Sequence, residues 1–222
     1  MGMESAIKGK FFVFDGIDCC GKETQARLLG DYLFDHPKDQ YYKLLNVVLT
    51  RNPSQSGYTI QLRDSLHDIK DPYEKARVLA DLFVKNRQWH IDRTILPNIA
   101  SGMMVLCVRY MYSTLAFQQT QGMSFDELNK MHDGMPVPDA VFFVDISADE
   151  CIRRKDKRLR EEEMFEKIEF QKKLRDNYLR LKEQLPNHPI HIINGERSAE
   201  EIQKDIRKIV DDLIFSSYPK VR

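Results

Sequence analysis

The segment Gly16–Lys22 has the residue types and the spacing that are needed to hold phosphate groups. Two glycines, Gly16 and Gly21, let backbone N–H groups point inward toward phosphate oxygens, and Lys22 adds a positive charge. The segment follows a short apolar run and opens a stretch of helical spacing, as a phosphate-binding loop (P-loop) requires. A tight turn with a solvated lysine is the plainer alternative. Because strand, glycines and lysine occur together, we interpret the segment as a P-loop.

Glu23 is the first departure from this motif. The residue after the lysine is normally Ser or Thr, whose hydroxyl binds Mg²⁺, whereas here Glu23 is followed by Thr24. The glutamate either ligates Mg²⁺ through its carboxylate or points away and leaves the metal to water and other groups. We expect ATP as phosphoryl donor, Mg²⁺ as metal and Glu23 as the candidate metal ligand. The residues expected to bind the donor are Gly16, Ile17, Asp18, Cys19, Cys20, Gly21, Lys22, Glu23 and Thr24, a loop over residues 16–24.

The elements that must position this loop follow an alternating pattern. Short apolar runs recur between longer segments of helical spacing, which predicts an α/β fold with a five-stranded parallel sheet flanked by helices on both faces. We expect one domain over residues 1–222, because single domains of this length are common. The predicted strands are Lys10–Phe14, Leu44–Leu49, Met103–Val108, Ala140–Val144 and Ile190–Ile193. The predicted helices are Gly21–Phe34, Tyr73–Ile99 as one bent helix or two, Ser124–Met131, an interrupted stretch within Glu150–Leu185, and a C-terminal helix from Ser198.

Polar residues follow each predicted strand. In an open parallel sheet the ligand binds beyond the carboxyl ends of the strands, so these junctions are where function is expected. The junction residues are Asp15–Asp18, Thr50–Pro53, Arg109 with Tyr110, Asp145, and Asn194 with Gly195.

Composition excludes several classes of partner. Lys plus Arg and Asp plus Glu each number 34, so the chain lacks the net charge expected of a protein that coats nucleic acid or an anionic membrane. We find no apolar run typical of a signal peptide or a membrane span, and we expect a cytoplasmic protein. The cysteines have no zinc-ligand spacing and are expected to be free thiols in a reducing compartment. They are Cys19, Cys20, Cys107 and Cys151.

Five segments resemble, in order, motifs of the thymidylate kinase family. Each alone would be weak, but five in register are highly specific, and the resemblance runs from about Lys10 to the C-terminal helix. It implies a P-loop NTPase fold with a small lid. The segments are Phe12–Gln25, similar to the first strand and P-loop; Thr50–Pro53, similar to Thr-Arg-Glu-Pro; Leu82–Arg87, similar to Leu-Phe-x-x-x-Arg; Arg109–Gln118, similar to an Asp-Arg-Tyr helix; and Gly134–Asp139, similar to Gly-x-Pro-x-Pro-Asp.

The resemblance implies a site for the base of a deoxynucleotide. Phe83 is expected to stack on thymine, and Arg87, one helical turn later, to contact the base or its phosphate. Gln118 is expected to bind the base edge, and Phe117 to pack near the 2′ carbon and disfavour ribonucleotides. Taken alone, Phe83 would more simply be helix core.

The resemblance also implies a site for the acceptor phosphate and sugar. Arg51 and Arg109 are expected to hold the phosphate, whose oxygens suit a guanidinium fork. Asp18 is expected to bind the sugar 3′-hydroxyl, and Ser113 belongs to the same substrate-binding set. Taken alone, Arg51 or Arg87 would be a surface ion-pair residue, the usual fate of an isolated arginine.

Val108 is the second departure from the family pattern. The family generally carries a carboxylate or another polar group there, which helps position Mg²⁺ or a bound water, and valine cannot do this. Either Glu23 supplies the missing carboxylate or metal handling is altered, and the sequence leaves both open.

The charged stretch from Arg153 to about Phe165 resembles the lid of the family. A solvated charged helix is the alternative for most of its residues. We expect one or two of Arg154, Arg158 and Arg160 to reach the phosphates, where they would share the charge of the transferred group with Lys22 and Arg109.

These inferences together predict ATP-dependent phosphorylation of dTMP to dTDP by a homodimer that binds small molecules rather than nucleic acid or membranes. Two alternatives remain. One is a kinase for another deoxynucleotide or a deoxynucleoside, although Arg51 and Arg109 favour a phosphorylated acceptor. The other is a nucleotide-binding regulatory homologue that lost activity when Glu23 and Val108 appeared.

Overall fold

The computed structural model describes residues 9–35, 45–67, 75–156 and 168–215, and its centre is a parallel sheet. Five strands are hydrogen-bonded in the order β2-β3-β1-β4-β5, which confirms the predicted sheet. The predicted Leu44 lies outside the described residues. The strands are β1 (Lys10–Asp15), β2 (Val47–Arg51), β3 (Met104–Val108), β4 (Ala140–Asp145) and β5 (Ile190–Asn194).

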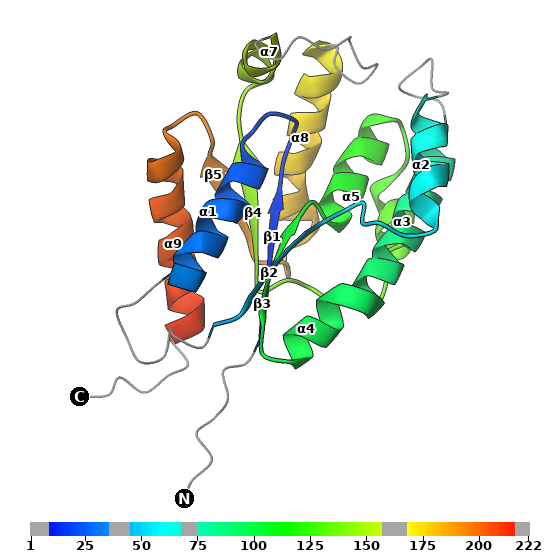
Figure 1. Cartoon of the computed structure of the whole chain (residues 1–222). Helices are drawn as coiled ribbons and strands as arrows, with labels where there is room; N and C mark the ends of the chain where they lie inside the picture. The colour runs from blue at the N-terminus through cyan, green and yellow to red at the C-terminus, as the bar shows by residue number, and fades with distance from the viewer. Residues whose placement is uncertain (1–8, 36–44, 68–74, 157–167, 216–222) are drawn as a thin grey trace, which may run out of the picture.

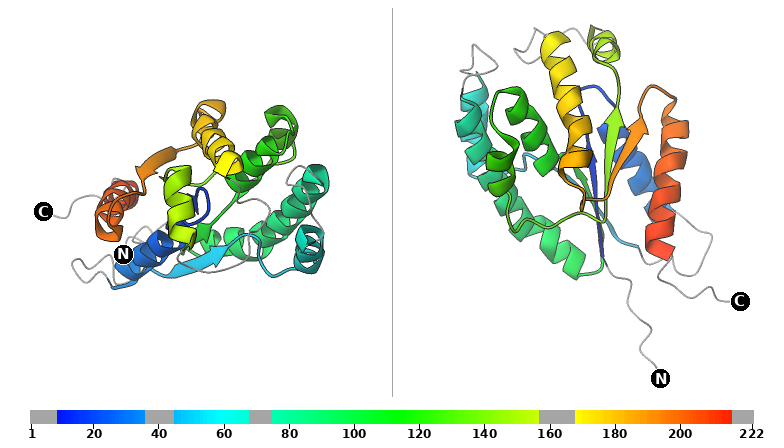
Figure 2. Two further views of the ribbon diagram at one scale, coloured as in Figure 1. Left: turned by 90° about the horizontal axis from the view of Figure 1, so that it is seen from above. Right: turned by 180° about the vertical axis from the view of Figure 1, so that it is seen from behind.

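Helices cover both faces of the sheet (Figures 1 and 2). One face carries α1 (Lys22–Asp35) and α9 (Ala199–Phe215). The opposite face carries α3 (Ala76–His90), α4 (Leu96–Ala100), α5 (Met111–Thr120) and α8 (Ile168–Gln184). This two-sided cover explains why β1, β3 and β4 are almost continuous apolar runs rather than alternating ones.

Alternate residues of β1 belong to different cores. Phe12 and Phe14 pack with α1 and α9, whereas Phe11 and Val13 pack with α5 and α8 on the other face. Successive side chains of a strand point to opposite faces, so β1 contributes to the hydrophobic layer on each face of the sheet. The P-loop leaves this central strand and is therefore anchored by both cores.

The long predicted helix is a continuous but irregular helical stretch. After α3 comes the π-helical segment η2 (Ile91–Ile95), and α4 carries Pro97 in its first turn, where proline is tolerated. Tyr73, the predicted start, lies outside the described residues. Figure 1 shows this stretch along one side of the sheet, running from α3 near the carboxyl ends of the strands down to α4 at the opposite end.

The structure contains a helix that our sequence analysis missed, α2 (Tyr58–His67). It packs on α3 through Leu62 and Leu79, while Ile60 and Leu66 stay largely exposed. Because so little of its apolar surface is buried, its sequence lacks a clear hydrophobic stripe, and only packing reveals it.

Two helices begin at a serine that caps the first turn. Ser198 and Glu201 exchange reciprocal hydrogen bonds at the start of α9. At α6 (Phe125–Lys130) Ser124 accepts from the Glu127 backbone N–H. The Glu127 carboxylate instead pairs with Arg77 on α3.

The predicted lid is described only at its start. The helix α7 (Ala148–Asp156) lies above the carboxyl end of the sheet in Figure 1 and includes Arg153 and Arg154. Arg158 and Arg160 lie outside the described residues.

Candidate active site

The loop between β1 and α1 has the backbone geometry of a phosphate cradle. Gly16 has φ +137°, and a Cβ there would lie 2.7 Å from the Val144 carbonyl oxygen. Gly21 has φ +96°. Side-chain-bearing residues rarely adopt these angles, so both glycines are required by the turn.

Lys22 faces into this loop. Its side chain is nearly buried, and Nζ donates to the Ile17 carbonyl oxygen at 2.9 Å. Nζ also lies 4.0 Å from Oδ1 of Asp18. The alternative of a solvated lysine is therefore wrong. The ammonium is held inside the loop, where P-loop lysines contact phosphates.

Asp15 is a buried hub that links three elements, although our sequence analysis gave it no role. Oδ1 accepts from the Gly16 N–H, the Ser113 hydroxyl and the Tyr178 hydroxyl. Oδ2 accepts from the N–H groups of Tyr110 and Ser113 at the start of α5. The carboxylate thus ties the P-loop to α5 and α8. The predicted substrate residue Ser113 acts here as part of that tie.

Arg109 lies where the P-loop meets α5, in a left-handed conformation with φ 65°. Such angles are costly for residues other than glycine and concentrate at functional sites. The guanidinium contacts the Asp18 carboxylate, donates to the Ser113 hydroxyl at 3.2 Å and lies 5.8 Å from the Phe117 ring centroid. Arg109 is thereby aimed between the P-loop and the space beside α5.

The charges of this junction reinforce each other. Burial raises the pKa of Asp18, but the positive charges of Arg109 and Lys22 outweigh it and hold that pKa below its usual value. Burial would lower the pKa of Arg109, but the Asp18 carboxylate raises it above its usual value. Both groups therefore stay ionised through the physiological range.

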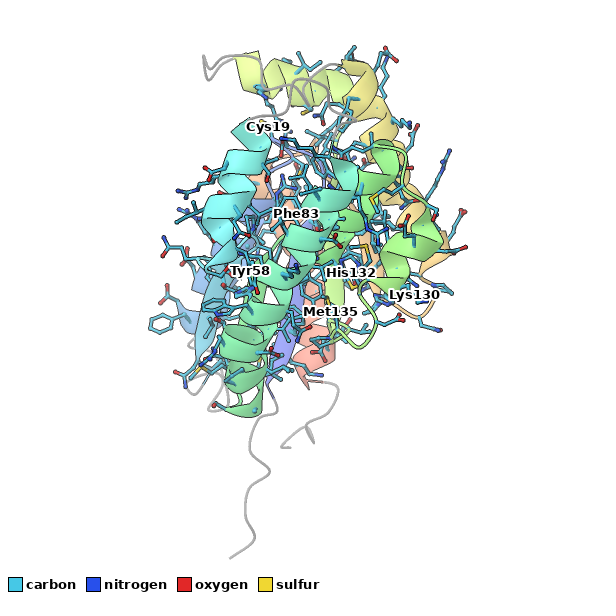
Figure 3. All side chains as sticks on the ribbon, turned by 90° about the vertical axis from the view of Figure 1, so that its right-hand side faces the viewer. Cys19, Tyr58, Phe83, Lys130, His132 and Met135 are labelled. Atoms are coloured by element: carbon cyan, nitrogen blue, oxygen red, sulfur yellow. The ribbon has the colours of Figure 1, made fainter. Side chains whose placement is uncertain are left out.

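A cavity of about 650 Å³ opens next to Arg109. Six residues predicted to bind the acceptor line it, and Figure 3 looks onto this side of the molecule with Phe83 labelled. The aromatic rings of Phe83 and Phe117 suit a planar ring as ligand. The lining residues are Asn52, Pro53, Leu66, Leu79, Phe83, Arg87, Arg109, Ser113, Thr114, Phe117, Gln118 and Gln121.

Arg87 is a buried cation in the wall of this cavity, with 1% of its surface exposed. Its terminal nitrogens contact His132 Nε2 at 2.8 Å, the Tyr110 carbonyl oxygen at 3.0 Å and the Thr114 hydroxyl at 2.9 Å. Burial lowers the pKa of Arg87 to about 10. The alternative of a surface ion pair is therefore wrong for Arg87.

Three side chains of the cavity carry buried polar atoms without a hydrogen-bond partner among the described residues. They are Asn52 Oδ1, Arg87 Nε and Gln118 Oε1. Leaving a buried polar group unpaired costs roughly 1–3 kcal/mol, and a ligand is one usual explanation. Two acceptors and one donor in the wall of this cavity therefore lack a partner among the described residues. Sequence analysis placed Asn52 in a motif but assigned it no function.

His90 holds Asn52 from the side away from its unpaired oxygen. Asn52 Nδ2 lies 3.0 Å from His90 Nδ1, and His90 Nε2 lies 2.7 Å from the Thr50 hydroxyl. Burial and then the charge of Arg87 lower the pKa of His90 to about 4. The neutral ring accepts from the Asn52 amide, which leaves Oδ1 of Asn52 as the free acceptor.

Arg51 and Glu23 face each other outside the cavity. Arg51 Nη1 lies 3.6 Å from Glu23 Oε1, and both side chains are more than half exposed. Arg51 does not line the cavity in this conformation. An exposed pair of this kind contributes little to stability and can exchange partners readily.

The described residues near the P-loop offer carboxylates for a metal but no cluster of them. Across the described ranges no three His, Cys, Asp or Glu side chains form a metal-binding group. Val108 is buried in the core and lies in register with Arg51, so it offers no ligand. Glu23 remains compatible with Mg²⁺, which is usually held by one or two carboxylates together with water and substrate phosphates.

Arg154 binds the backbone of the P-loop. Its guanidinium donates to the carbonyl oxygens of Cys19 at 3.2 Å and Gly195 at 2.8 Å, and Nε donates to Glu150 at 2.6 Å. This lid arginine thus reaches the loop that was predicted to hold the donor. Its contact with phosphates stays a prediction.

The chain is similar to known proteins over most of its length. A family model described as thymidylate kinase matches residues 14–206. The chain is 34% identical to a probable thymidylate kinase of Pyrococcus abyssi, covering 92% of this chain and 97% of that protein. It is 35% identical to a probable thymidylate kinase of Pyrococcus horikoshii, with the same coverage. A crystal structure of thymidylate kinase from Ehrlichia chaffeensis shares the fold at 24% identity and a TM-score of 0.70, covering 91% of this chain and 98% of that one.

Proposed function

The chain belongs to the thymidylate kinase family, and on this premise we propose that it transfers the γ-phosphoryl group of ATP to dTMP. One observation carries the proposal for this chain. A P-loop that encloses Lys22 is joined through Asp18 and Arg109 to a cavity whose buried polar atoms lack partners. That arrangement suits a phosphoryl donor on one side and an uncharged ring with polar edges on the other.

The unpaired atoms support a thymine base. Gln118 Oε1 would accept from N3–H of thymine, and Arg87 Nε would donate to the O4 carbonyl. Cytosine offers an acceptor at N3 and an amino donor at position 4, so it mismatches both contacts. A site built to hydrogen-bond its substrate rejects the wrong partner strongly because its own polar groups stay unpaired. Phe83 and Phe117 would hold the ring and sugar from the cavity walls.

The acceptor phosphate would be held by Arg109 together with Arg51. Arg109 lies between cavity and P-loop, and the exposed Arg51 would leave Glu23 to reach the phosphate. Transfer through a loose transition state needs alignment and positive charge more than covalent help. Lys22, Arg109 and the lid arginines would provide that charge. Asp18 would position the sugar 3′-hydroxyl.

Mg²⁺, when bound, would supply positive charge that offsets the negative charge of the donor phosphates. Glu23 is the residue of this chain that we assign to hold it. If Glu23 moved from Arg51 to the metal, Arg51 would be free to bind the acceptor phosphate.

We further propose a homodimer in the cytoplasm. Val78 and Trp89, three turns apart on α3, are both exposed, and the exposed Leu96 follows on α4. An exposed apolar stripe of this kind suits a helix-to-helix interface. All four cysteines are free thiols, as expected in a reducing compartment. In the described residues no helix is long and apolar enough to cross a membrane. Sedimentation of wild type and Trp89→Glu tests the dimer, and a monomeric wild type would contradict it.

A coupled ATP-turnover assay with a panel of acceptors tests the activity. We expect the highest kcat/KM with dTMP. A higher value with dCMP, dGMP, AMP or thymidine would favour a different acceptor. Tight nucleotide binding without turnover of any acceptor would favour the regulatory homologue.

A further inference from the structure

His132 is not among the residues that the sequence predicted for the site. It follows α6, is 3% exposed, and is labelled in Figure 3 on the same side of the molecule as Phe83. Its Nδ1 is 2.7 Å from the Leu128 carbonyl oxygen, and its Nε2 is 2.8 Å from Arg87 Nη1. These contacts determine the tautomer. A carbonyl oxygen can only accept, so Nδ1 carries the proton, and Nε2 must accept from Arg87 because a guanidinium can only donate.

The contact holds Arg87 without neutralising it. The terminal nitrogens of Arg87 donate to His132, the Tyr110 carbonyl and the Thr114 hydroxyl, and none of these three acceptors is negatively charged. A carboxylate in the place of His132 would hold the guanidinium equally well but would cancel its charge. The planar fork is fixed by these bonds, and this leaves Nε as the donor without a partner.

The ring stays in this state over the physiological pH range. Burial and then the positive charge of Arg87 lower the pKa of His132 to about 3, while the hydrogen bond to Leu128 opposes that change only partly. A protonated ring would place a second cation against Arg87 and lose the acceptor. The neutral ring therefore keeps both hydrogen bonds throughout the physiological pH range.

We propose that His132 is a positioning residue that fixes the buried Arg87 cation through an uncharged acceptor and thereby sets the preference for a pyrimidine with a carbonyl group at position 4. This inference rests on the proposed function. A fixed N–H donor pairs with the carbonyl of thymine, whereas the amino group of cytosine is itself a donor and leaves both groups unpaired. If Arg87 could turn, it would lose this discrimination.

Three variants test the assignment. His132→Leu removes both hydrogen bonds, His132→Gln keeps one donor and one acceptor, and His191→Gln on β5 is a matched control far from the cavity lining. For His132→Leu we expect KM for dTMP to rise about tenfold and the preference for dTMP over dCMP to fall about tenfold. The reason is that Arg87 loses its buried hydrogen bond to His132. KM for ATP should stay within about twofold. His132→Gln should restore most of the loss, and the control should resemble wild type.

A measurement on wild type guards against a His132→Leu variant that fails to fold. In ¹⁵N-histidine NMR spectra we expect His132 to be neutral, with the proton on Nδ1, down to pH 5. The opposite tautomer, or titration near pH 6.5, would overturn the inference, as would a His132→Leu enzyme that keeps the full preference for dTMP. If wild type itself shows no preference for dTMP over dCMP, the proposed function fails, and the NMR result still decides the His132 contact.

Discussion

Two arginines at opposite ends of the site differ in almost every physical respect. Arg87 is 1% exposed and held by three uncharged acceptors, whereas the Arg51 side chain is 61% exposed and faces the Glu23 carboxylate. A buried guanidinium cannot easily reorient, so it suits discrimination between bases. An exposed one exchanges partners at little cost, so it suits a phosphate that arrives and leaves. The end that we assign to the base is therefore preorganised, and the end that we assign to the acceptor phosphate is free to rearrange.

The largest effect is expected from Arg109, which joins the two ends. Arg109→Ala would remove the charge-assisted contact that we propose to the acceptor phosphate, and it should cost on the order of 2–5 kcal/mol in kcat/KM for the acceptor. ATP affinity should barely change, because the P-loop keeps Lys22. Steady-state kinetics with binding calorimetry measures both, and Arg77→Ala, an exposed arginine paired with Glu127, is the matched control. A loss of only a few-fold would refute the role of Arg109.

The second effect separates a structural carboxylate, Asp15, from Asp18, which we assign to substrate binding. Asp15 accepts five hydrogen bonds inside the protein, so Asp15→Asn should lower the free energy of unfolding by roughly 2–4 kcal/mol. Asp18→Asn should lower it by less than about 1 kcal/mol, because that carboxylate is partly exposed. Urea unfolding of both variants tests the contrast. Equal losses would mean that Asp18 is as structural as Asp15.

The third effect is the pH dependence of the free energy of unfolding, which probes the preorganised end of the site around Arg87. The pKa values of His90 and His132 are lowered to about 4 and about 3, chiefly by burial. In the unfolded state the pKa of histidine is about 6.5. As pH falls below that value, the unfolded state binds protons on these histidines while the folded state does not. The free energy of unfolding is therefore highest above about pH 6.5 and decreases below it. We expect a decrease of about 1–2 kcal/mol per histidine between pH 7 and pH 5.

Urea unfolding of wild type and His132→Gln at the two pH values measures this term. The variant lacks one of these two histidines, so its decrease should be smaller than that of wild type by about 1–2 kcal/mol. Identical decreases would show that His132 is already protonated or exposed in the folded protein.

The smallest effect concerns Glu23 at the rearranging end. Glu23→Ala should change stability by less than about 1 kcal/mol, because its pair with Arg51 is exposed. It should nevertheless weaken the use of Mg²⁺ and ATP, and Val108→Asp should partly rescue it. A double-mutant cycle on kcat/KM at limiting Mg²⁺ should deviate from additivity by more than about 0.5 kcal/mol. Additive effects would mean that Glu23 serves as the partner of Arg51 alone.

Much of the fold was predictable because the determining signals are local. The glycines of the P-loop, the capping serines and the apolar runs of β1, β3 and β4 act through neighbours in the chain. The motifs also identified residues such as Phe83 and Gln118, which the structure brings together in one cavity. Spacing along a strand or helix determines which residues share a face, so this information is present before folding.

Only the tertiary structure decided how those residues are held. Asp15 meets Tyr178, and Arg87 meets His132, across long stretches of chain, and no periodicity relates the partners. The helix α2 was invisible because it buries little more than Leu62. A histidine in the sequence gives no sign of which nitrogen will be protonated. Packing places a carbonyl on one side of the ring and a guanidinium on the other. They determine the protonated nitrogen, because a carbonyl oxygen can only accept a hydrogen bond and a guanidinium can only donate one.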